Sequence, residues 1–442
     1  MTDIYFSYDT EDFTSDYASD AIRDIARILR ENGIRANFNV VGYLARELVR
    51  HNRRDVLEEL KYHAISLHSL RHSFHPTICE YTDTEDFFEG LSEFCRQEYE
   101  AMGMVKAATG ADELLACGLP GNSFSYVALY GYASMGLPLH FGSSYRLYDG
   151  TGGLTYFCNT YNADYYRPAL EELLLSVPET DLDVLADRLA QRKRVVLYDH
   201  PNRVLYSDWW DMVNYRGENK HPYGQWKEAP RREQSDVDRY YRVFRALLRR
   251  LKNDPRFRFP TPEDLLRETD HFYHGRVVRR QDLPAVINAL KKDFTWLSLP
   301  VPLSIADCFF AFRHFLDSDD PYVPGCVHGF LETPEGITEP VTVTREEVEK
   351  AVRDLSPDSF LPPFVAVGGK RLGPADLLFA MAGVLEGKDR VTLMPREQNC
   401  SLERLKWLNE ERIGQTWIHS PNLENRYLTK RLRLQAWTII TE

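Results

Sequence analysis

The sequence lacks the features of secreted, membrane-spanning and nucleic-acid-binding proteins. Its seven cysteines are an odd number without a Cys-x-x-Cys pair, which fits neither a disulfide framework nor a cysteine zinc site. No apolar run approaches the roughly 18–20 residues that span a bilayer, and residues 1–9 do not resemble a signal peptide. The 54 Lys+Arg against 66 Asp+Glu give a net charge of −12, without a long basic run. We therefore expect reduced thiols, a cytoplasmic location, no membrane span and no nucleic-acid partner.

What the sequence does have is the size and composition of a globular protein with more than one domain. Its 442 residues are 43% hydrophobic and 27% charged, which is ordinary for folded chains. A chain of this length can bury two or more substantial cores.

Strands and helices alternate through the N-terminal part of the chain. A helix is expected from about 17 to 31, because its apolar residues form one stripe that ends at Asn32-Gly33. Strand followed by helix, repeated, is typical of a parallel sheet or (β/α) barrel, in which chemistry collects at the C-terminal ends of the strands. The expected strands are 4–8, 36–42, 65–67, 114–119, 139–143, 195–198 and 257–259.

Carboxylates and histidines follow three of these expected strands. Asp9 opens an acidic cluster, 9–12, after the first strand, and His200 follows strand 195–198. His68 and His72 follow strand 65–67; on a helical turn, two residues four apart share a face, with Cβ atoms about 5–6 Å apart. Two imidazoles and one carboxylate can hold a divalent ion and leave positions open for water and a substrate carbonyl. The sequence therefore predicts a metal site on one rim of the sheet.

An aromatic-rich stretch, 201–226, follows His200. It contains Tyr206, Trp209, Trp210, Tyr215, Tyr223 and Trp226, with Asp208 and Asp211 between them. Aromatic faces with interleaved polar groups suit sugar rings, and the alternative is an insertion that packs on itself.

From about residue 272 the alternation of strands and helices gives way to a mostly helical pattern. Helices are expected at 282–294 and 344–355, and each leads to a Leu-Pro step and a second apolar helix. Because 303–316 matches 372–385 at the leucines, Ala-Asp, Phe and Ala, we predict an internal duplication. The expected domain is smaller and mostly helical, spans 272–442, and contains two related units at about 281–316 and 344–385. The alternative is a pair of unrelated helices with common residue types.

The N-terminal motifs resemble those of the polysaccharide deacetylase family, the NodB-homology group or carbohydrate esterase family 4. Four features occur in the order and spacing of that family: Asp9 with a carboxylate just after it, and the segments 36–42, 65–72 and 197–201. The likeness runs from residue 1 to about 268. The resemblance implies an α/β fold, a distorted (β/α) barrel over 1–271. It also implies a metal-dependent hydrolase that removes N-acetyl groups from a sugar or polysaccharide intermediate.

The resemblance also implies roles for individual residues. Asp9 matches the catalytic base of the family, and His200 matches the late histidine that acts as general acid. His68 and His72 match the two histidine ligands of the metal.

The carboxylate ligand of the metal rests on a finer likeness. Related branches place it two positions after the base, which selects Glu11, with Asp12 as the substitute. The expected ion is divalent, with zinc preferred, and the expected partner is a carbohydrate or an N-acetylated small molecule.

Two motifs of the family are absent. Gly118 stands where the family carries the arginine of an Arg-x-Pro motif, whose charge orients the catalytic aspartate, and no Asp-Trp pair occurs near 143–145 to support the late histidine. Arg71 and Arg146 are candidates to replace the arginine. Two alternatives therefore stand beside the deacetylase: a non-catalytic glycan-binding protein on a degenerate barrel, and a hydrolase of another small amide or cyclic imide.

The C-terminal region is similar to pseudomurein-binding repeats, chiefly at 364–371 before the second apolar helix. That similarity implies glycan or envelope binding. The alternative is a packing or dimerisation domain, through which the protein would form a homo-oligomer.

Overall fold

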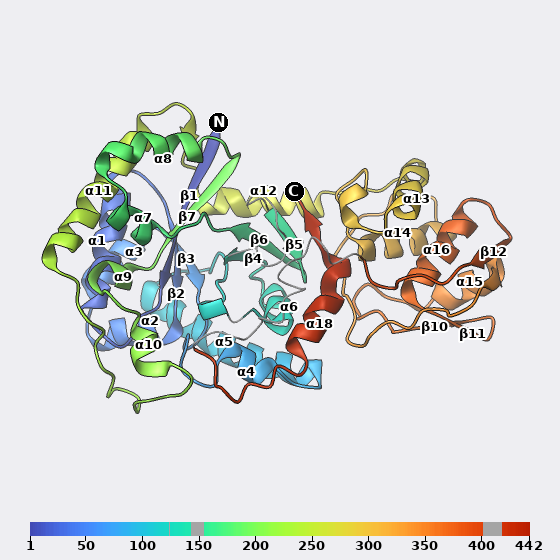
Figure 1. Ribbon diagram of the computed structural model, residues 1–442, viewed down its shortest axis with the longest axis horizontal. Helices are drawn as coiled ribbons and strands as arrows, with labels where there is room; N and C mark the ends of the chain where they lie inside the picture. Colours follow the sequence, from blue (N-terminus) through green and yellow to red (C-terminus); the bar gives the residue numbers. More distant parts are fainter. Residues whose placement is uncertain (123, 143–153, 401–417) are drawn as a thin grey trace.

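A computed structural model describes residues 1–122, 124–142, 154–400 and 418–442. In Figure 1 the helices of the N-terminal part surround a central sheet, and the elements of residues 283–393, coloured gold to orange, form a separate group beside it. The strands of the first part are β1 (Thr2–Thr10), β2 (Asn37–Val40), β3 (Ala64–Leu67), β4 (Leu139–Gly142), β5 (Leu154–Phe157), β6 (Thr160–Asp164), β7 (Arg194–Asp199) and β8 (Phe257–Arg258).

The sheet is built around β1, whose nine residues are all buried. β1 pairs in parallel with β2, β7 and β8, and β2 pairs in parallel with β3. β4 and β6 form a second parallel pair, with β5 antiparallel to β6. A parallel sheet is covered on both faces, which explains why every residue of β1, β2, β3 and β7 is buried.

Single parallel bridges link the two groups of strands. Leu67 of β3 bridges Cys117, Cys117 bridges His140 of β4, and Tyr165 after β6 bridges Val196 of β7. The pairing therefore runs from β1 through β2, β3, Cys117, β4 and β6 to β7 and back to β1. The predicted α/β class with a parallel sheet is confirmed.

One expected strand is much shorter than predicted. Within 114–119 only Cys117 takes part in a bridge. Pro120 begins a 3₁₀ turn, Pro120–Asn122, and a proline has no N–H to continue a ladder.

Helices cover the outside of the sheet. The predicted helix at 17–31 is found as α1, and its buried Ile22, Ile25 and Leu29 belong to the main core. The helices of this part are α1 (Ala18–Glu31), α2 (Gly42–Arg50), α3 (Arg54–Leu60), α4 (Ile78–Thr82), α5 (Phe87–Thr109), α6 (Tyr126–Ser134), α7 (Leu170–Ser176), α8 (Leu182–Leu189), α9 (Pro201–Leu205), α10 (Trp210–Tyr215), α11 (Gln234–Lys252) and α12 (Pro262–His274).

The C-terminal group contains the four expected helices and short strand pairs. α14 begins with a capping box between Ser304 and Asp307, and Asp376 likewise accepts a bond from the N–H of Gly373 at the start of α16. The duplication stays a prediction. The elements are α13 (Leu283–Lys292), α14 (Ile305–Asp317), β9 (Val341–Thr344), α15 (Arg345–Val352), β10 (Val365–Val367), β11 (Lys370–Leu372), α16 (Pro374–Leu385) and β12 (Arg390–Leu393).

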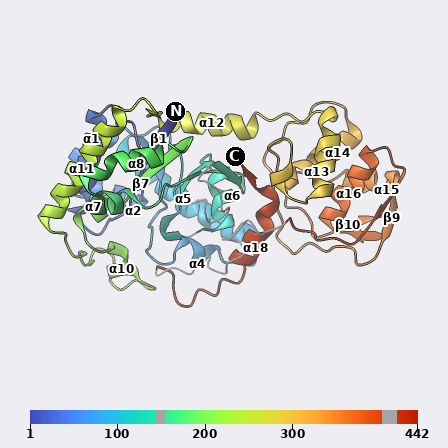
Figure 2. The same cartoon turned by 45° about the horizontal axis from the view of Figure 1, so that its top comes forward.

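The last residues return to the N-terminal part. β13 (Ile440–Thr441) pairs antiparallel with β5, and Asp83 accepts bonds from the N–H groups of Tyr427 and Leu428 at the start of α18 (Leu428–Leu434). Figure 2 shows α18 between the two groups of elements. The division at residue 271 stays a prediction. Among the described residues, no helix has both the length and the apolar character needed to cross a membrane.

Candidate metal and catalytic site

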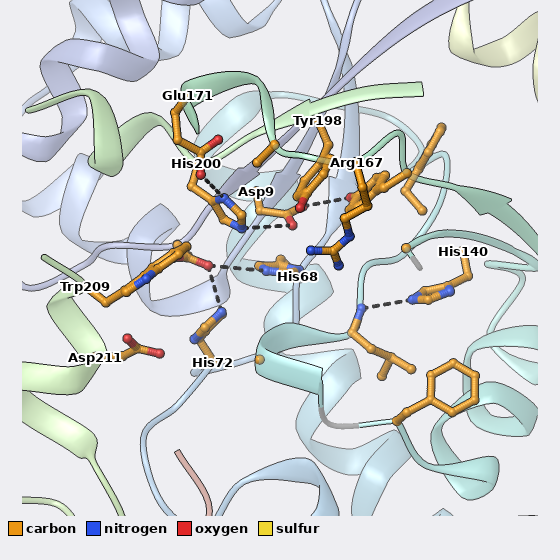
Figure 3. A pocket seen from close by; sticks show the side chains of 18 of the residues that line it. Asp9, His68, His72, His140, Arg167, Glu171, Tyr198, His200, Trp209 and Asp211 are labelled. Atoms are coloured by element: carbon orange, nitrogen blue, oxygen red, sulfur yellow. Dashed lines mark hydrogen bonds and ion pairs between the residues drawn. The ribbon is translucent and has the colours of Figure 1, made fainter. Parts of the chain in front are cut away.

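A cavity of about 280 Å³ lies at the C-terminal ends of the parallel strands (Figure 3). Asp9, Glu11, His68, His72 and His200, the five residues predicted from the sequence, all line it. The first two come from the end of β1 and the loop after it, the next two follow β3, and the last follows β7. The parallel arrangement thus brings together residues that are far apart in the sequence.

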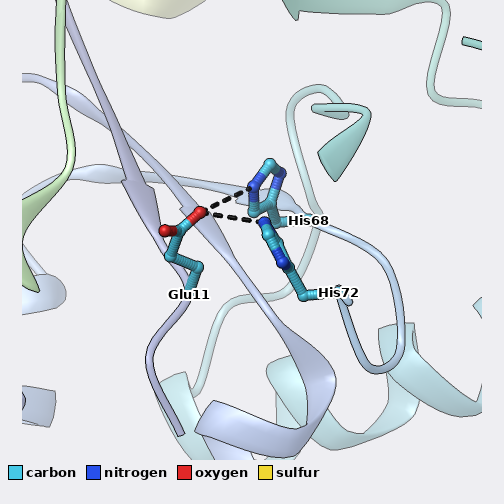
Figure 4. A group of neighbouring side chains, drawn as sticks. All are labelled: Glu11, His68 and His72. Atoms are coloured by element: carbon cyan, nitrogen blue, oxygen red, sulfur yellow. Dashed lines mark ion pairs between the residues drawn. The ribbon is translucent and has the colours of Figure 1, made fainter. Parts of the chain in front are cut away.

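Glu11, His68 and His72 form a buried group that could hold a metal ion (Figure 4). One ligand atom from each lies within 4.8 Å of the others. Glu11 Oε2 is 2.9 Å from His72 Nε2 and 3.8 Å from His68 Nε2. His72 Nε2 is nevertheless buried without a hydrogen bond, as expected of a ligand atom that points at a common centre. Two imidazoles and a carboxylate are a suitable donor set for a divalent ion.

Asp12, the other candidate for the carboxylate ligand, is turned away from this group. Its Oδ1 accepts bonds from the backbone N–H and the hydroxyl of Thr14, at 2.9 and 2.7 Å. The structure therefore favours Glu11.

The histidine pair does not lie on a helical turn, so the expected local structure is wrong. No helix covers His68 to His72, and Ser69 and His72 have positive φ angles of 65° and 49°. Ser69 Oγ accepts a bond from the N–H of His72 at 3.0 Å, and Leu70 N–H donates to the buried Glu98. These hydrogen bonds stabilise a tight loop after β3. The loop still brings the imidazole centroids of His68 and His72 to within 5.1 Å of each other.

Hydrogen bonds behind the histidines orient them. His68 Nδ1 donates to the carbonyl of Gly118 at 3.0 Å. His72 Nδ1 donates to Ser73 Oγ at 2.6 Å, and that hydroxyl donates onward to Asp211 at 2.9 Å. In both rings Nδ1 is engaged by an outer partner, so Nε2 is the ring nitrogen that faces Glu11. Such outer bonds fix the tautomer and direction of histidine ligands.

Glu11 is held as a carboxylate. Burial alone would raise its pKa, but the charge of His72 and the bond with His68 lower the pKa well below its ordinary value. Trp210 Nε1 donates to the other oxygen, Oε1, at 3.1 Å, so Oε2 stays directed at the histidines.

Asp9 and His200 face each other beside this group. Asp9 Oδ2 is 3.8 Å from His200 Nε2, and Oδ1 accepts bonds from Asn39 Nδ2 at 2.7 Å and from the hydroxyl of Tyr165 at 3.0 Å. One carboxylate oxygen is therefore fully engaged, and the other points into the cavity.

Glu171, on α7, is a site residue that the sequence analysis missed. Its Oε1 lies 2.9 Å from His200 Nδ1, and Figure 3 shows the imidazole between Glu171 and Asp9. Burial lowers the pKa of His200, but the charge and hydrogen bond of Glu171, together with the charges of Glu11 and Asp9, outweigh burial and raise the pKa to about 10. In the sequence, Glu171 and Glu172 resemble the ordinary acidic first turn of a helix, so no signal marked one of them.

No protein-family model and no curated protein sequence matches this chain. Several solved structures do. This chain is similar to polysaccharide deacetylases. One neighbour is a putative polysaccharide deacetylase from Mycobacterium smegmatis, with a TM-score of 0.41 and 11% identity over 60% of this chain and 89% of that chain. A probable polysaccharide deacetylase from Pseudomonas aeruginosa has a TM-score of 0.38 and 12% identity over 62% and 92%. A Puue allantoinase has a TM-score of 0.40 and 12% identity over 62% and 92%.

The aromatic stretch 201–226 mostly packs inside the protein. Tyr206, Trp210 and Tyr215 are fully buried, and Trp210 stacks edge-on against Phe13. Trp209 is the ring of this stretch that lines the cavity, with its centroid 4.8 Å from that of His200. Most of these rings therefore match the alternative expectation, an insertion that packs on itself.

The structure also shows what surrounds Gly118, where the family arginine was expected. A Cβ atom there would lie 2.8 Å from His68 Nδ1 and 3.3 Å from Asn39, so no larger side chain fits without moving His68. Among the described residues, no hydrogen bond or ion pair joins Arg71 to Asp9. Arg146 and 143–145 lie outside the described residues.

Proposed function

We propose that this protein is a metal-dependent amide hydrolase that removes N-acetyl groups from a sugar or polysaccharide intermediate. The observation that carries the proposal is the convergence of Glu11, His68 and His72 in one cavity with Asp9 and His200. A ligand group, a carboxylate base and a protonated imidazole are the parts that hydrolysis of an amide requires.

Each side chain has a defined task in this proposal. A divalent ion bound by Glu11, His68 and His72 would supply Lewis-acid polarisation of the substrate carbonyl. Asp9 Oδ2 accepts a proton from the water whose oxygen bonds to the amide carbon. His200 Nε2 donates its proton to the amide nitrogen as the C–N bond breaks, so that acetate and a free amine are released.

Zinc is the proposed ion, because two imidazoles and one carboxylate form its common catalytic donor set and leave a position open. The cavity of about 280 Å³ lies near the lower end of the roughly 300–1,000 Å³ of ligand pockets. This size favours a small N-acetylated group, and it also supports the second candidate, a hydrolase of another small amide or cyclic imide.

The test combines metal analysis with a substrate panel. The purified protein should contain about one equivalent of zinc or a similar ion, and the loaded protein should release acetate from an N-acetylated sugar or oligosaccharide. Asp9→Asn should retain the metal and lose acetate release by at least about 100-fold, the lower range for a general base. Asp3→Asn is the matched control, because Asp3 lies at the far end of β1 in an ion pair with Arg258.

The outcomes separate the candidates. Unchanged acetate release in Asp9→Asn with the metal retained contradicts the role of Asp9. Hydrolysis of cyclic imides but not of N-acetyl sugars favours the second candidate. Glycan binding without turnover of any amide in the panel identifies a binding protein.

A further inference from the structure

Asp9 Oδ1 accepts hydrogen bonds from two uncharged side chains. Asn39 Nδ2 lies 2.7 Å and Tyr165 Oη 3.0 Å from it. Asn39 is buried completely and Tyr165 almost so. Both donors bind the same oxygen, and Oδ2 faces His200.

The register of the strands fixes the amide of Asn39. Asp9 on β1 lies opposite Asn39 on β2, and Asn37, two residues earlier on the same face, donates through Nδ2 to Asn39 Oδ1 at 3.0 Å. Ser66 on β3 in turn donates to Asn37 Oδ1. With its oxygen occupied in this way, Asn39 presents its NH₂ group to Asp9. The direction of the amide is thus set by a chain of buried bonds across three strands.

Tyr165 is equally constrained. Its ring stacks on Tyr198, with centroids 4.2 Å apart and planes at 5°. Burial, together with the charge of Asp9, raises the pKa of Tyr165 well above its ordinary value, so the hydroxyl keeps its hydrogen and acts as a donor.

Gly118 makes room for this arrangement. Because a Cβ atom at position 118 would lie 3.3 Å from the Asn39 amide, a long cationic side chain from this position would compete with Asn39 for the same space. Neither of the two groups bound to Oδ1 is a cation.

We propose that Asn39 and Tyr165 are the positioning residues of Asp9, which hold Oδ1 and leave Oδ2 as the oxygen that accepts the proton. The assignment rests on the proposed function for its catalytic meaning. Its physical basis is that a misplacement of about 1 Å in a reacting group can cost about 100-fold in rate.

The experiment uses zinc-loaded full-length protein and the variants Tyr165→Phe and Tyr165→Phe/Asn39→Ala. We expect kcat for acetate release to fall about 10-fold in the first and about 100-fold in the second. KM and zinc content should stay within about twofold, because neither side chain belongs to the ligand group. Crystal structures should show the Asp9 carboxylate rotated from its wild-type torsion angles.

Tyr161→Phe is the matched control. Tyr161 lies on β6, four residues before Tyr165, and its hydroxyl bonds Asp270 on α12, so the variant also loses a tyrosine hydroxyl without touching Asp9. The proposal is overturned if Tyr165→Phe lowers kcat no more than Tyr161→Phe does and Asp9 keeps its orientation. If the double variant does not fold, Tyr165→Phe alone decides.

Failure of the proposed function would look different. Wild-type protein that binds zinc but hydrolyses no amide refutes the activity. The crystallographic torsion angles of Asp9 in Tyr165→Phe still decide whether Tyr165 positions the carboxylate.

Discussion

Glu171 controls the proton on His200. Glu171 is buried and His200 is partly buried, and the carboxylate lies 2.9 Å from Nδ1, close enough for its charge to favour the imidazolium strongly. In Glu171→Gln the neighbouring side chain keeps its shape and loses its charge. His200 should then release its proton at a lower pH, because burial continues to disfavour the charged ring.

The size of this change follows from the pKa of His200. The pKa is raised from an ordinary 6.5 to about 10, with Glu171 the largest raising influence and with smaller ones from Glu11 and Asp9. Removing an opposite charge at this range lowers a pKa by about 1–3 units, so the variant should titrate at about 7–9. Above that pH the imidazole has no proton for the leaving amine, and kcat should fall.

The assay is the pH dependence of kcat from pH 6 to 10.5 for zinc-loaded protein, with NMR titration of the His200 ring as a readout that needs no turnover. The alkaline limb should move to lower pH in Glu171→Gln and stay in place in Glu172→Gln, since Glu172 is exposed and its charge is screened by solvent. An alkaline limb and a ring titration that remain at the wild-type pH would refute the reasoning.

Stability should show the same linkage. Because the pKa of His200 is higher in the folded state than the ordinary 6.5, the protonated ring stabilises the fold fully below about pH 6.5, and this contribution is lost as pH rises towards about 10. The difference in unfolding free energy between wild type and Glu171→Gln should therefore shrink across that range.

Two further predictions concern the bonds behind the histidine ligands. Gly118→Ala should displace the ring of His68, because the new Cβ atom would lie 2.8 Å from Nδ1. We expect zinc affinity, measured by chelator competition, to fall about 10–100-fold. Unchanged affinity would show that the ring has room to move. Ser73→Ala breaks the link from His72 to Asp211. It should weaken zinc affinity by about 10–100-fold with little change in melting temperature. A lower melting temperature with unchanged zinc affinity would contradict this role.

The residues of the metal group could be predicted from the sequence because each one follows a strand. Glu11 comes just after β1, and His68 and His72 come after β3, so the parallel sheet alone brings them to one rim. The helical turn assumed for the two histidines was wrong. A loop with two positive φ angles brings them together instead, and spacing in the sequence cannot distinguish the two geometries.

Residues that act through another side chain were not predictable in this way. Asn39 lies within a short buried strand and Glu171 within the first turn of a helix, and neither position by itself marks a site residue. Their roles depend on partners more than 25 positions away, Asp9 and His200. The aromatic stretch 201–226 shows the opposite error. Its sequence pattern suggested a surface for binding sugar rings, but most of its rings fill the core around Trp210.

Gly118 lies between the candidate metal group and Asp9, the proposed base. Its carbonyl accepts the bond from His68 Nδ1, and the missing Cβ leaves space for that ring and for the Asn39 amide. An arginine at this position would orient Asp9 only by displacing the groups that now orient both Asp9 and His68. The glycine therefore fits the proposed site, in which the neutral donors Asn39 and Tyr165 position Asp9. On this proposal, a glycine at position 118 does not by itself exclude catalysis.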